Sequence, residues 1–236
     1  MKLNTNSNVY TIVYAAVMVI IVAFLLAFVS SSLKDIQNAN VENDTKGQIL
    51  TALNYDKSAI NVQQTFTDGV KDMLFKDGEL VPYEGDFLTT YGTAIKNGEL
   101  HVFCGNTADG QPAYVVPMVG RGLWGGLWGY VAVAVKDNAP KVVGTYFYHE
   151  SETAGLGARI GDRDFQEKFI GRSIFDAEGN IALCVVKDGA GNQEFDVDGI
   201  TGATLTSKGV SAMIQDGLAA YKDFLLSICN KQEVEQ

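Results

Sequence analysis

The earliest pattern along the chain is a run of apolar residues without a single charge, from Tyr10 to Val29. About 20 such residues are needed for a helix to cross a bilayer, whereas the apolar region of a cleaved signal peptide spans about 7–15. Only Lys2 precedes the run, so the basic start of a signal peptide is weak. We therefore predict a retained transmembrane anchor in residues 1–33. The flanking charges are too balanced to orient it.

Polar residues with spaced apolar positions follow, and they predict a helical stalk over residues 34–60, broken near Asp44 to Gly47. A second helix is expected over Val62–Phe75, ended by Asp77 and Gly78. The pattern then changes to short runs rich in Val, Tyr and Phe between turn residues, which predict strands. These runs are His101–Cys104, Ala113–Met118, Tyr130–Val135, Lys141–Tyr148 and Ile181–Val186.

Two further helices complete the pattern. A short one is expected over Arg163–Ile170. Near the C-terminus, apolar residues recur at steps of three or four and predict one buried helical face: Val210, Met213, Ile214, Leu218, Tyr221 and Leu225. The order of elements predicts an α+β domain over residues 61–236, with a mainly antiparallel sheet and flanking helices. No Gly-x-Gly-x-x-Gly follows a first strand, so nothing indicates a dinucleotide site.

Composition narrows the class of partner. The 236 residues carry a net charge of −10, which disfavours nucleic acid and anionic lipid head groups as ligands. Three scattered cysteines and two isolated histidines form no metal-ligand spacing and no disulfide framework, so we predict no metal site. Cys104 and Cys184 lie in apolar runs and are interpreted as core residues.

The string Asp198-Gly-Ile-Thr-Gly-Ala-Thr-Leu-Thr-Ser207 stands immediately before the C-terminal helical pattern. Free backbone N–H groups and the helix dipole at such a position favour a phosphate. The other interpretation is an ordinary N-cap, because Thr206 or Ser207 would cap this helix. Spacing alone leaves both open.

DGITGAT resembles the flavinylation motif of FMN-binding domains in bacterial respiratory membrane complexes. The resemblance implies that a flavin transferase joins FMN through its phosphate to Thr204, since a threonine hydroxyl needs an external enzyme to activate it. It also implies that Asp198 and Thr201 serve recognition by the transferase, while Gly202 and Ala203 leave room for the phosphate. Leu205, Thr206 and Lys208 are counted with this cofactor site, and Lys208 is expected to help neutralise the phosphate.

Two loops carry further candidate chemistry. Residues 120–129 read GRGLWGGLWG and hold both tryptophans of the chain, Trp124 and Trp128. Glycines admit a flat ligand and an indole stacks on one, but a Gly-aromatic turn feeding the next strand explains the same pattern. Residues 150–157 read ESETAGLG, which suits the polar edge of a ligand or an ordinary surface loop.

The opening NSNVYTIVYAAVMVI, the GLWG loop, the SETAGLGARI loop and DGITGATLTS occur in the same order as in the NqrC family, which provides one subunit of the Na⁺-translocating NADH:quinone oxidoreductases. Ala154 replaces the proline usual in that family, which removes no functional group. The resemblance implies that Trp124, Glu152, Thr153, Leu156 and Gly157 surround the flavin.

The same resemblance implies a place and a role. The chain is expected to be a single-pass protein of the bacterial inner membrane, anchored in the lipid bilayer through residues 10–29, with its FMN domain on the periplasmic side. It would relay electrons between redox centres of partner subunits during NADH oxidation, quinone reduction and Na⁺ export. No catalytic acid–base pair is needed for that, because the flavin carries the chemistry.

Two alternatives remain from the sequence. The G-type subunit of the Rnf ferredoxin:NAD⁺ oxidoreductases shares the anchor and the flavinylation motif. A membrane-anchored binding or assembly module without a redox role is the other, with Thr204 as an N-cap only.

Overall fold

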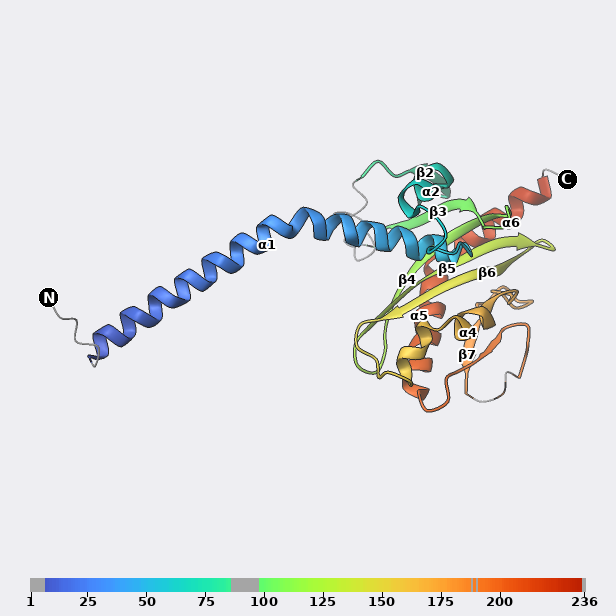
Figure 1. The fold of residues 1–236 in the computed structure, drawn as a ribbon. Coiled ribbons are helices and arrows are strands. Elements are labelled where there is room, and N and C mark those ends of the chain that lie inside the picture. Colours follow the sequence, from blue (N-terminus) through green and yellow to red (C-terminus); the bar gives the residue numbers. More distant parts are fainter. Residues whose placement is uncertain (1–6, 86–97, 188, 190, 235–236) are drawn as a thin grey trace. The chain divides into compact units, whose positions relative to one another are not determined.

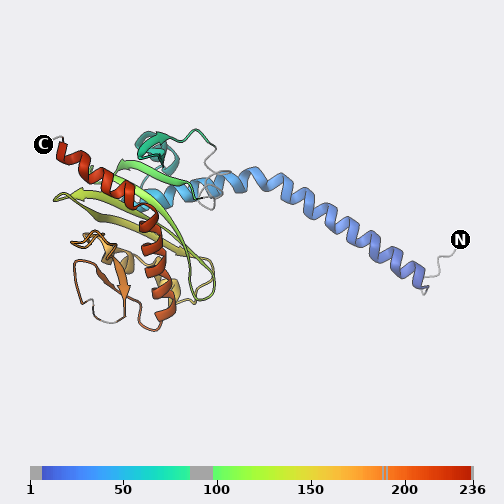
Figure 2. The same cartoon turned by 180° about the vertical axis from the view of Figure 1, so that it is seen from behind.

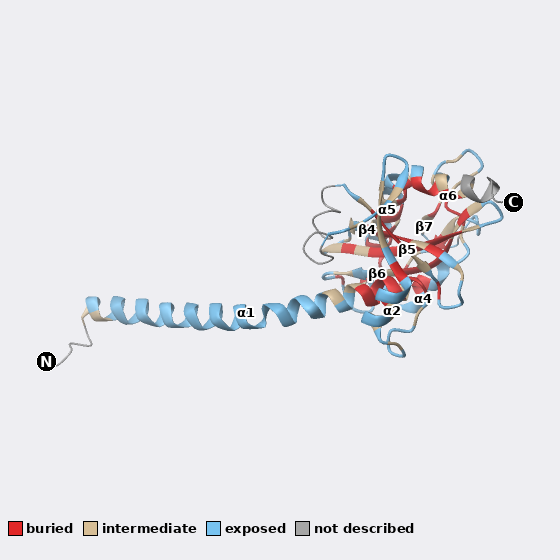
Figure 3. Ribbon diagram, turned by 90° about the horizontal axis from the view of Figure 1, so that it is seen from above, coloured by how far each residue is buried: buried red, intermediate tan, exposed pale blue. Residues whose placement is uncertain are grey.

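A computed structural model describes residues 7–85, 98–187, 189 and 191–234 of the chain. It divides into two compact units, Met1–Glu42 and Asn43–Gln236. Helix α1, Asn8–Ala52, begins in the first unit and ends in the second. Its N-terminal part contains an 18-residue window with a mean hydropathy of 3.1 that is entirely unburied (Figure 3). By length and composition, α1 is the one helix among the described residues able to cross a membrane.

The second unit is built on a six-stranded sheet of order β2-β1-β3-β4-β5-β6 in which all neighbours are antiparallel. A separate pair of short strands, β7 and β8, runs parallel. The strands are β1 Val70–Lys76, β2 Glu79–Pro82, β3 Leu100–Asn106, β4 Pro112–Arg121, β5 Gly126–Lys136, β6 Ala139–His149, β7 Cys184–Val186 and β8 Asp196–Asp198. This mainly antiparallel α+β domain confirms the predicted fold class.

Alternating burial along the strands creates a core on each face of the sheet. One core packs the sheet against helices α5, Thr204–Ala220, and α6, Lys222–Val234, and against the segment η1, α4 and η2. That segment comprises η1 Gly157–Gly161, α4 Arg163–Gln166 and η2 Glu167–Phe169. The other core packs the sheet against the end of α1 and against α2, Val62–Gly69 (Figures 1 and 2).

Several expected elements are confirmed, with shifted limits. The strand runs at 101–104, 113–118, 130–135 and 141–148 all lie within β3 to β6, and the short helix at 163–170 forms as α4 and η2. All six apolar residues predicted for the C-terminal helical face are buried. Tyr221, however, stands between α5 and α6, so that face is divided between two helices.

Two expectations were wrong, and a third was confirmed only over part of its range. Residues 70–75 form strand β1 rather than the end of a helix, because Gly69 ends α2 and pairing with β2 and β3 outweighs local helical spacing. Helix α1 continues through Asp44–Gly47 without a break. Gly47 is buried there, and core packing offsets the roughly 1 kcal/mol that a helical glycine costs. The strand expected at 181–186 is confined to β7.

The predicted limits at residues 33 and 60 stay predictions. Residues 43–53 nevertheless belong to the second unit, where Ile49, Leu50 and Leu53 are fully buried in its core. Part of the predicted stalk therefore helps to build the domain.

Candidate functional site

The motif Asp198–Thr204 connects the end of β8 to the first residue of α5. Gly202 has a φ of 82°, a left-handed conformation that favours glycine. The N-cap is Ala203, and no side chain caps the helix. Ser207 lies one turn inside α5, where its hydroxyl accepts a 3.0 Å hydrogen bond from the Ile200 N–H. The N-cap interpretation with Thr206 or Ser207 was therefore wrong, and Ser207 instead ties the loop to the helix.

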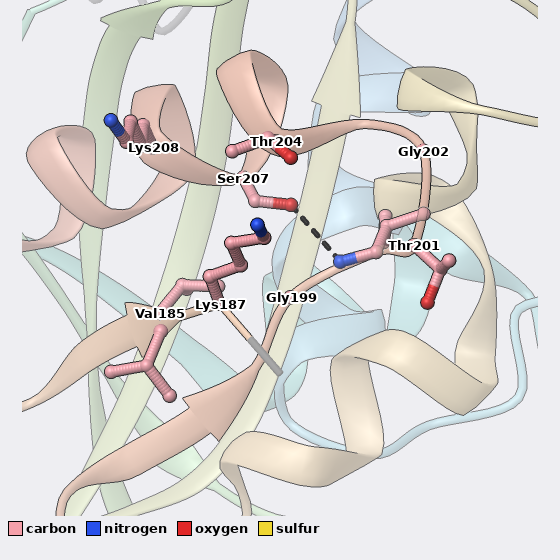
Figure 4. A pocket seen from close by; sticks show the side chains of 10 residues that line it. Val185, Lys187, Gly199, Thr201, Gly202, Thr204, Ser207 and Lys208 are labelled. Carbon is pink, nitrogen blue, oxygen red and sulfur yellow. Dashed lines mark hydrogen bonds between the residues drawn. The ribbon is translucent and has the colours of Figure 1, made fainter. Parts of the chain in front are cut away.

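A cavity of about 260 Å³ opens between this loop, the first turn of α5 and the end of β7 (Figure 4). Thr204 is exposed and borders it. The remaining lining residues are Val185, Val186, Lys187, Gly199, Ile200, Thr201, Gly202, Ser207 and Lys208. Drug-sized ligands usually occupy roughly 300–1,000 Å³. The cavity therefore suits one end of such a ligand rather than the whole.

The wall of the cavity favours an anion. The first hydrogen bond that closes α5 runs from the Ser207 N–H to the Ala203 carbonyl at 2.9 Å, so earlier N–H groups point toward the loop. A Cβ atom at Gly199 would lie 3.0 Å from both the Ser207 hydroxyl and the Val186 carbonyl, which explains why a glycine fits there. The helix N-terminus and two lysines then give the site a positive character.

The GLWG segment forms the turn of the β4–β5 hairpin, closed by a 2.9 Å hydrogen bond from the Gly122 N–H to the Gly125 carbonyl. Two glycines let α5 lie directly on this hairpin. A Cβ at Gly209 would come within 2.4 Å of the Arg121 carbonyl oxygen, and one at Gly120 within 2.6 Å of the Met213 Cβ. The hairpin turn is thereby held beside α5, and Trp124 is 66% exposed.

Glu152 connects all three segments. Its buried carboxylate accepts a 2.8 Å hydrogen bond from the Trp124 N–H at Oε1 and a 2.6 Å hydrogen bond from the Thr206 hydroxyl at Oε2. The Glu152 N–H donates to Nδ1 of His149 at 3.1 Å. Burial acts to raise the pKa of Glu152, but the hydrogen bonds that its carboxylate accepts from the Thr206 hydroxyl and from the main chain of residues 123–125 outweigh burial and hold the pKa below its usual range. Glu152 is therefore an ionised residue whose carboxylate connects the β4–β5 turn to α5.

The loop that follows Glu152 is folded tightly against the motif. The Thr153 carbonyl accepts hydrogen bonds from the N–H groups of Leu156 and Ala158, both at 3.1 Å. Leu156 is exposed and lies against Gly202, since a Cβ on that glycine would be 3.0 Å from Leu156 Cδ2. Gly157 is buried, and a Cβ there would meet the Thr206 hydroxyl at 2.5 Å. The fold thus brings together all three sequence motifs.

Comparison of the chain with known proteins shows which family has this sequence and fold. A model of the FMN-binding domain matches residues 122–219, which include the GLWG turn and both later loops. The NqrC protein of the Na⁺-translocating NADH-quinone reductase from Haemophilus ducreyi is 30% identical over 230 residues, covering 89% of each chain. The Neisseria meningitidis serogroup A protein of the same name is 29% identical, again with 89% of each chain covered.

The chain belongs to the NqrC family of the Na⁺-translocating NADH-quinone reductases.

Solved structures agree with that assignment. The crystal structure of the NqrC protein from Parabacteroides distasonis has a TM-score of 0.72 and 38% identity, covering 82% of this chain and 96% of that one. NqrC of Shewanella oneidensis shares the fold, with a TM-score of 0.64 at 23% identity, covering 79% and 98%. The family expected from the motifs is therefore confirmed.

Within this NqrC fold, the predicted site residues divide by location. Thr201, Gly202, Thr204 and Lys208 line the cavity, while Leu205 is exposed on the first turn of α5. Asp198 and Thr153 are also exposed, and Ala203 and Thr206 are buried. Trp128 lies elsewhere. It is on the sheet face opposite α5, where its ring lies 5.2 Å from Tyr148 and its Nε1 donates to Gln48 at 3.3 Å.

Sequence reasoning missed Lys187. Lys187 directly follows β7 and lies 17 residues before Thr204 in sequence. The parallel pairing of β7 with β8 brings it to the cavity. A lone lysine after a short strand carries no sequence signal that would have found it.

Proposed function

We propose that this chain is the electron-carrying subunit of a Na⁺-translocating NADH:quinone reductase, with FMN bound covalently through its phosphate to Thr204. The observation that carries the proposal is the exposed Thr204 hydroxyl at the rim of a positively charged cavity, inside an FMN-binding domain. The N-terminus of α5, which borders the cavity, favours the phosphate end of FMN.

The attachment needs a partner, a flavin transferase. The Thr204 oxygen forms a bond to the phosphorus of an activated flavin donor, the bond from phosphorus to the donor's leaving group breaks, and a base of the transferase takes the threonine proton. Nothing near Thr204 in the described part of the chain resembles a catalytic base, which supports an external enzyme. Asp198 and Thr201 lie on the exposed side of the loop, where the transferase would engage them.

The flavin ring would lie outside the 260 Å³ cavity, over exposed apolar side chains. Leu123, Trp124, Leu156 and Leu205 are all more than 40% exposed around the three joined loops. When bound, the isoalloxazine supplies the one- and two-electron redox chemistry. The protein would fix the position of the ring through the residues around it. Glu152 holds the Trp124 main chain by a hydrogen bond, and the absence of a side chain at Gly202 lets Leu156 pack against the motif loop.

We further propose that residues 10–29 cross the inner membrane once and that the domain lies on the periplasmic side, beside other subunits of the complex. The unburied apolar window of α1 supports the anchor. Covalent attachment would keep the flavin from being lost in an extracytoplasmic compartment. Protease added to intact spheroplasts should digest the domain, and a protected domain would contradict this orientation.

The experiment that tests the cofactor is fluorescence of the full-length protein in a denaturing gel, followed by peptide mass spectrometry. We expect a yellow fluorescent band and an FMN mass on Thr204. A non-redox assembly module would give no fluorescence. An FMN mass on Thr206 or Ser207 would show that the residue assignment is wrong.

A further inference from the structure

Lys187 lines the cavity although it lies outside the three sequence motifs, and the main chain just before it is anchored. Val186, the residue before it, accepts a 2.9 Å hydrogen bond from the Gly199 N–H through its carbonyl oxygen. The Val185 N–H donates to the Ser211 hydroxyl of α5 at 3.0 Å. The strand that carries Lys187 is therefore fixed both to the motif loop and to α5, so its Cα position is set by the fold.

Charge at this cavity departs from that of the whole chain. The chain has 28 acidic against 18 basic residues, yet the described residues that line the cavity include Lys187 and Lys208 and no carboxylate. Neither lysine forms an ion pair with any residue that the structure describes. Two unneutralised cations beside a helix N-terminus are complementary to a phosphate group.

The two lysines differ in direction. In Figure 4, the Lys187 side chain extends from the end of β7 toward the first turn of α5, where Thr204 and Ser207 lie. The Lys208 side chain points away from that opening. Lys208 is close to Thr204 in sequence, but its side chain is turned away from the cavity opening. Lys187 is distant in sequence, and the fold brings its side chain to the opening.

We propose that Lys187 is the main counter-charge of the flavin phosphate and positions the phosphoester against the β7–α5 wall, with Lys208 contributing little. This inference rests on the proposed function. A phosphodiester between flavin and threonine keeps one negative charge, and a single ammonium group balances it. In this role Lys187 would hold the phosphate and take no part in forming the ester bond, so it acts as a positioning residue.

Lysine acylation of the native full-length protein tests this directly. The flavinylated protein and its Thr204→Val variant are treated with a low concentration of an acetylating reagent, and mass spectrometry follows each lysine. Pairing with phosphate stabilises the unreactive ammonium form, so we expect Lys187 to react about fivefold or more slowly in the flavinylated protein. Lys208 should react equally in both. Equal reactivity of Lys187, or protection of Lys208 instead, would overturn the inference.

A second measurement separates positioning from stability. Lys187→Gln should retain flavin on Thr204 but let it move more freely, which lowers the fluorescence anisotropy of the native protein. Lys187→Arg should restore the anisotropy, and Lys208→Gln should leave it unchanged. Unchanged anisotropy in Lys187→Gln would contradict the inference while the covalent flavin still stood. Absence of flavin from Thr204 in the unmodified sequence would overturn the proposed function together with it.

Discussion

The Thr206 hydroxyl donates a 2.6 Å hydrogen bond to Oε2 of Glu152, which lies 54 positions earlier in the chain. Thr204, two residues before, instead faces the cavity. Two threonines on one helical turn thus have separate tasks, because residues two apart in a helix point to different sides. Thr206 joins α5 to the neighbouring loops, and Thr204 lies at the cavity, where we propose its modification.

The first prediction separates these tasks. Thr204→Val should abolish in-gel flavin fluorescence and change the free energy of unfolding by no more than about 0.5 kcal/mol, as is usual at exposed positions. Thr206→Val should retain the flavin but lose about 1–3 kcal/mol, because a buried carboxylate loses a donor. Gel fluorescence and chemical denaturation measure both. Thr206→Ser is the control that keeps the hydroxyl, and a fluorescent Thr204→Val protein would refute the assignment.

The second prediction concerns Glu152 itself. Glu152→Ala should lower the free energy of unfolding by about 1–3 kcal/mol, since the Trp124 N–H and the Thr206 hydroxyl both lose their acceptor. Glu150→Ala is the matched control, because Glu150 lies in the same loop but is exposed, where its carboxylate accepts a 3.2 Å hydrogen bond from the Gly126 N–H. Thermal melting of the two variants should differ clearly. Equal melting temperatures would mean that the hydrogen bonds of the Glu152 carboxylate do not contribute to the stability of the fold.

A third prediction follows from the lowered pKa of Glu152. A carboxyl group with a lower pKa in the folded state stabilises the fold above its unfolded pKa, near 4.5 here, and loses that contribution as the pH falls through the folded value. The difference in melting temperature between the unmodified protein and Glu152→Gln should therefore be constant at neutral pH and shrink below about pH 4.5. A difference that grows in acid would have the wrong sign.

Asp198 supports a fourth prediction. Asp198→Ala should give a folded protein with little flavin, because the proposed role is recognition by the transferase. The main chain at this position keeps its contact, since the Lys168 ammonium donates to the Asp198 carbonyl oxygen at 3.4 Å. Asp216→Ala, at an exposed position on α5, serves as the control. Flavinylation of Asp198→Ala at the normal rate would remove the proposed role.

The fifth prediction concerns the aromatic residue of the hairpin turn. Trp124→Leu should keep the covalent flavin but shift its absorption spectrum or midpoint potential. An aromatic contact contributes about 0.5–1.5 kcal/mol, and about 1 kcal/mol corresponds to roughly 40 mV for one electron. Trp128→Leu should leave both unchanged, because Trp128 packs on the other face of the sheet. If neither spectrum nor potential moves in Trp124→Leu, Trp124 is a turn residue only.

The sequence predicted the elements whose signal is local. The apolar runs that form β3 to β6 and the periodic apolar face shared by α5 and α6 could be predicted without tertiary information. Residues 70–75 were predicted as helix because their apolar spacing suits one. They form a strand because they pair with β2 and β3, which local spacing does not reveal. The motifs identified the loops of the candidate site, but they did not indicate that Glu152 connects these loops by hydrogen bonds. Lys187 was out of reach because its place depends on the pairing of β7 with β8.

The hydrogen bond from the Trp124 main chain to Glu152 has a practical consequence for protein engineering. The turn is held by a backbone N–H, which every residue except proline retains, while the indole extends into solvent. Position 124 can therefore accept a graded series of side chains, including fluorinated tryptophans, without moving the hairpin. If the proposed flavin stacks on this residue, such a series would adjust its potential in small steps on an unchanged scaffold.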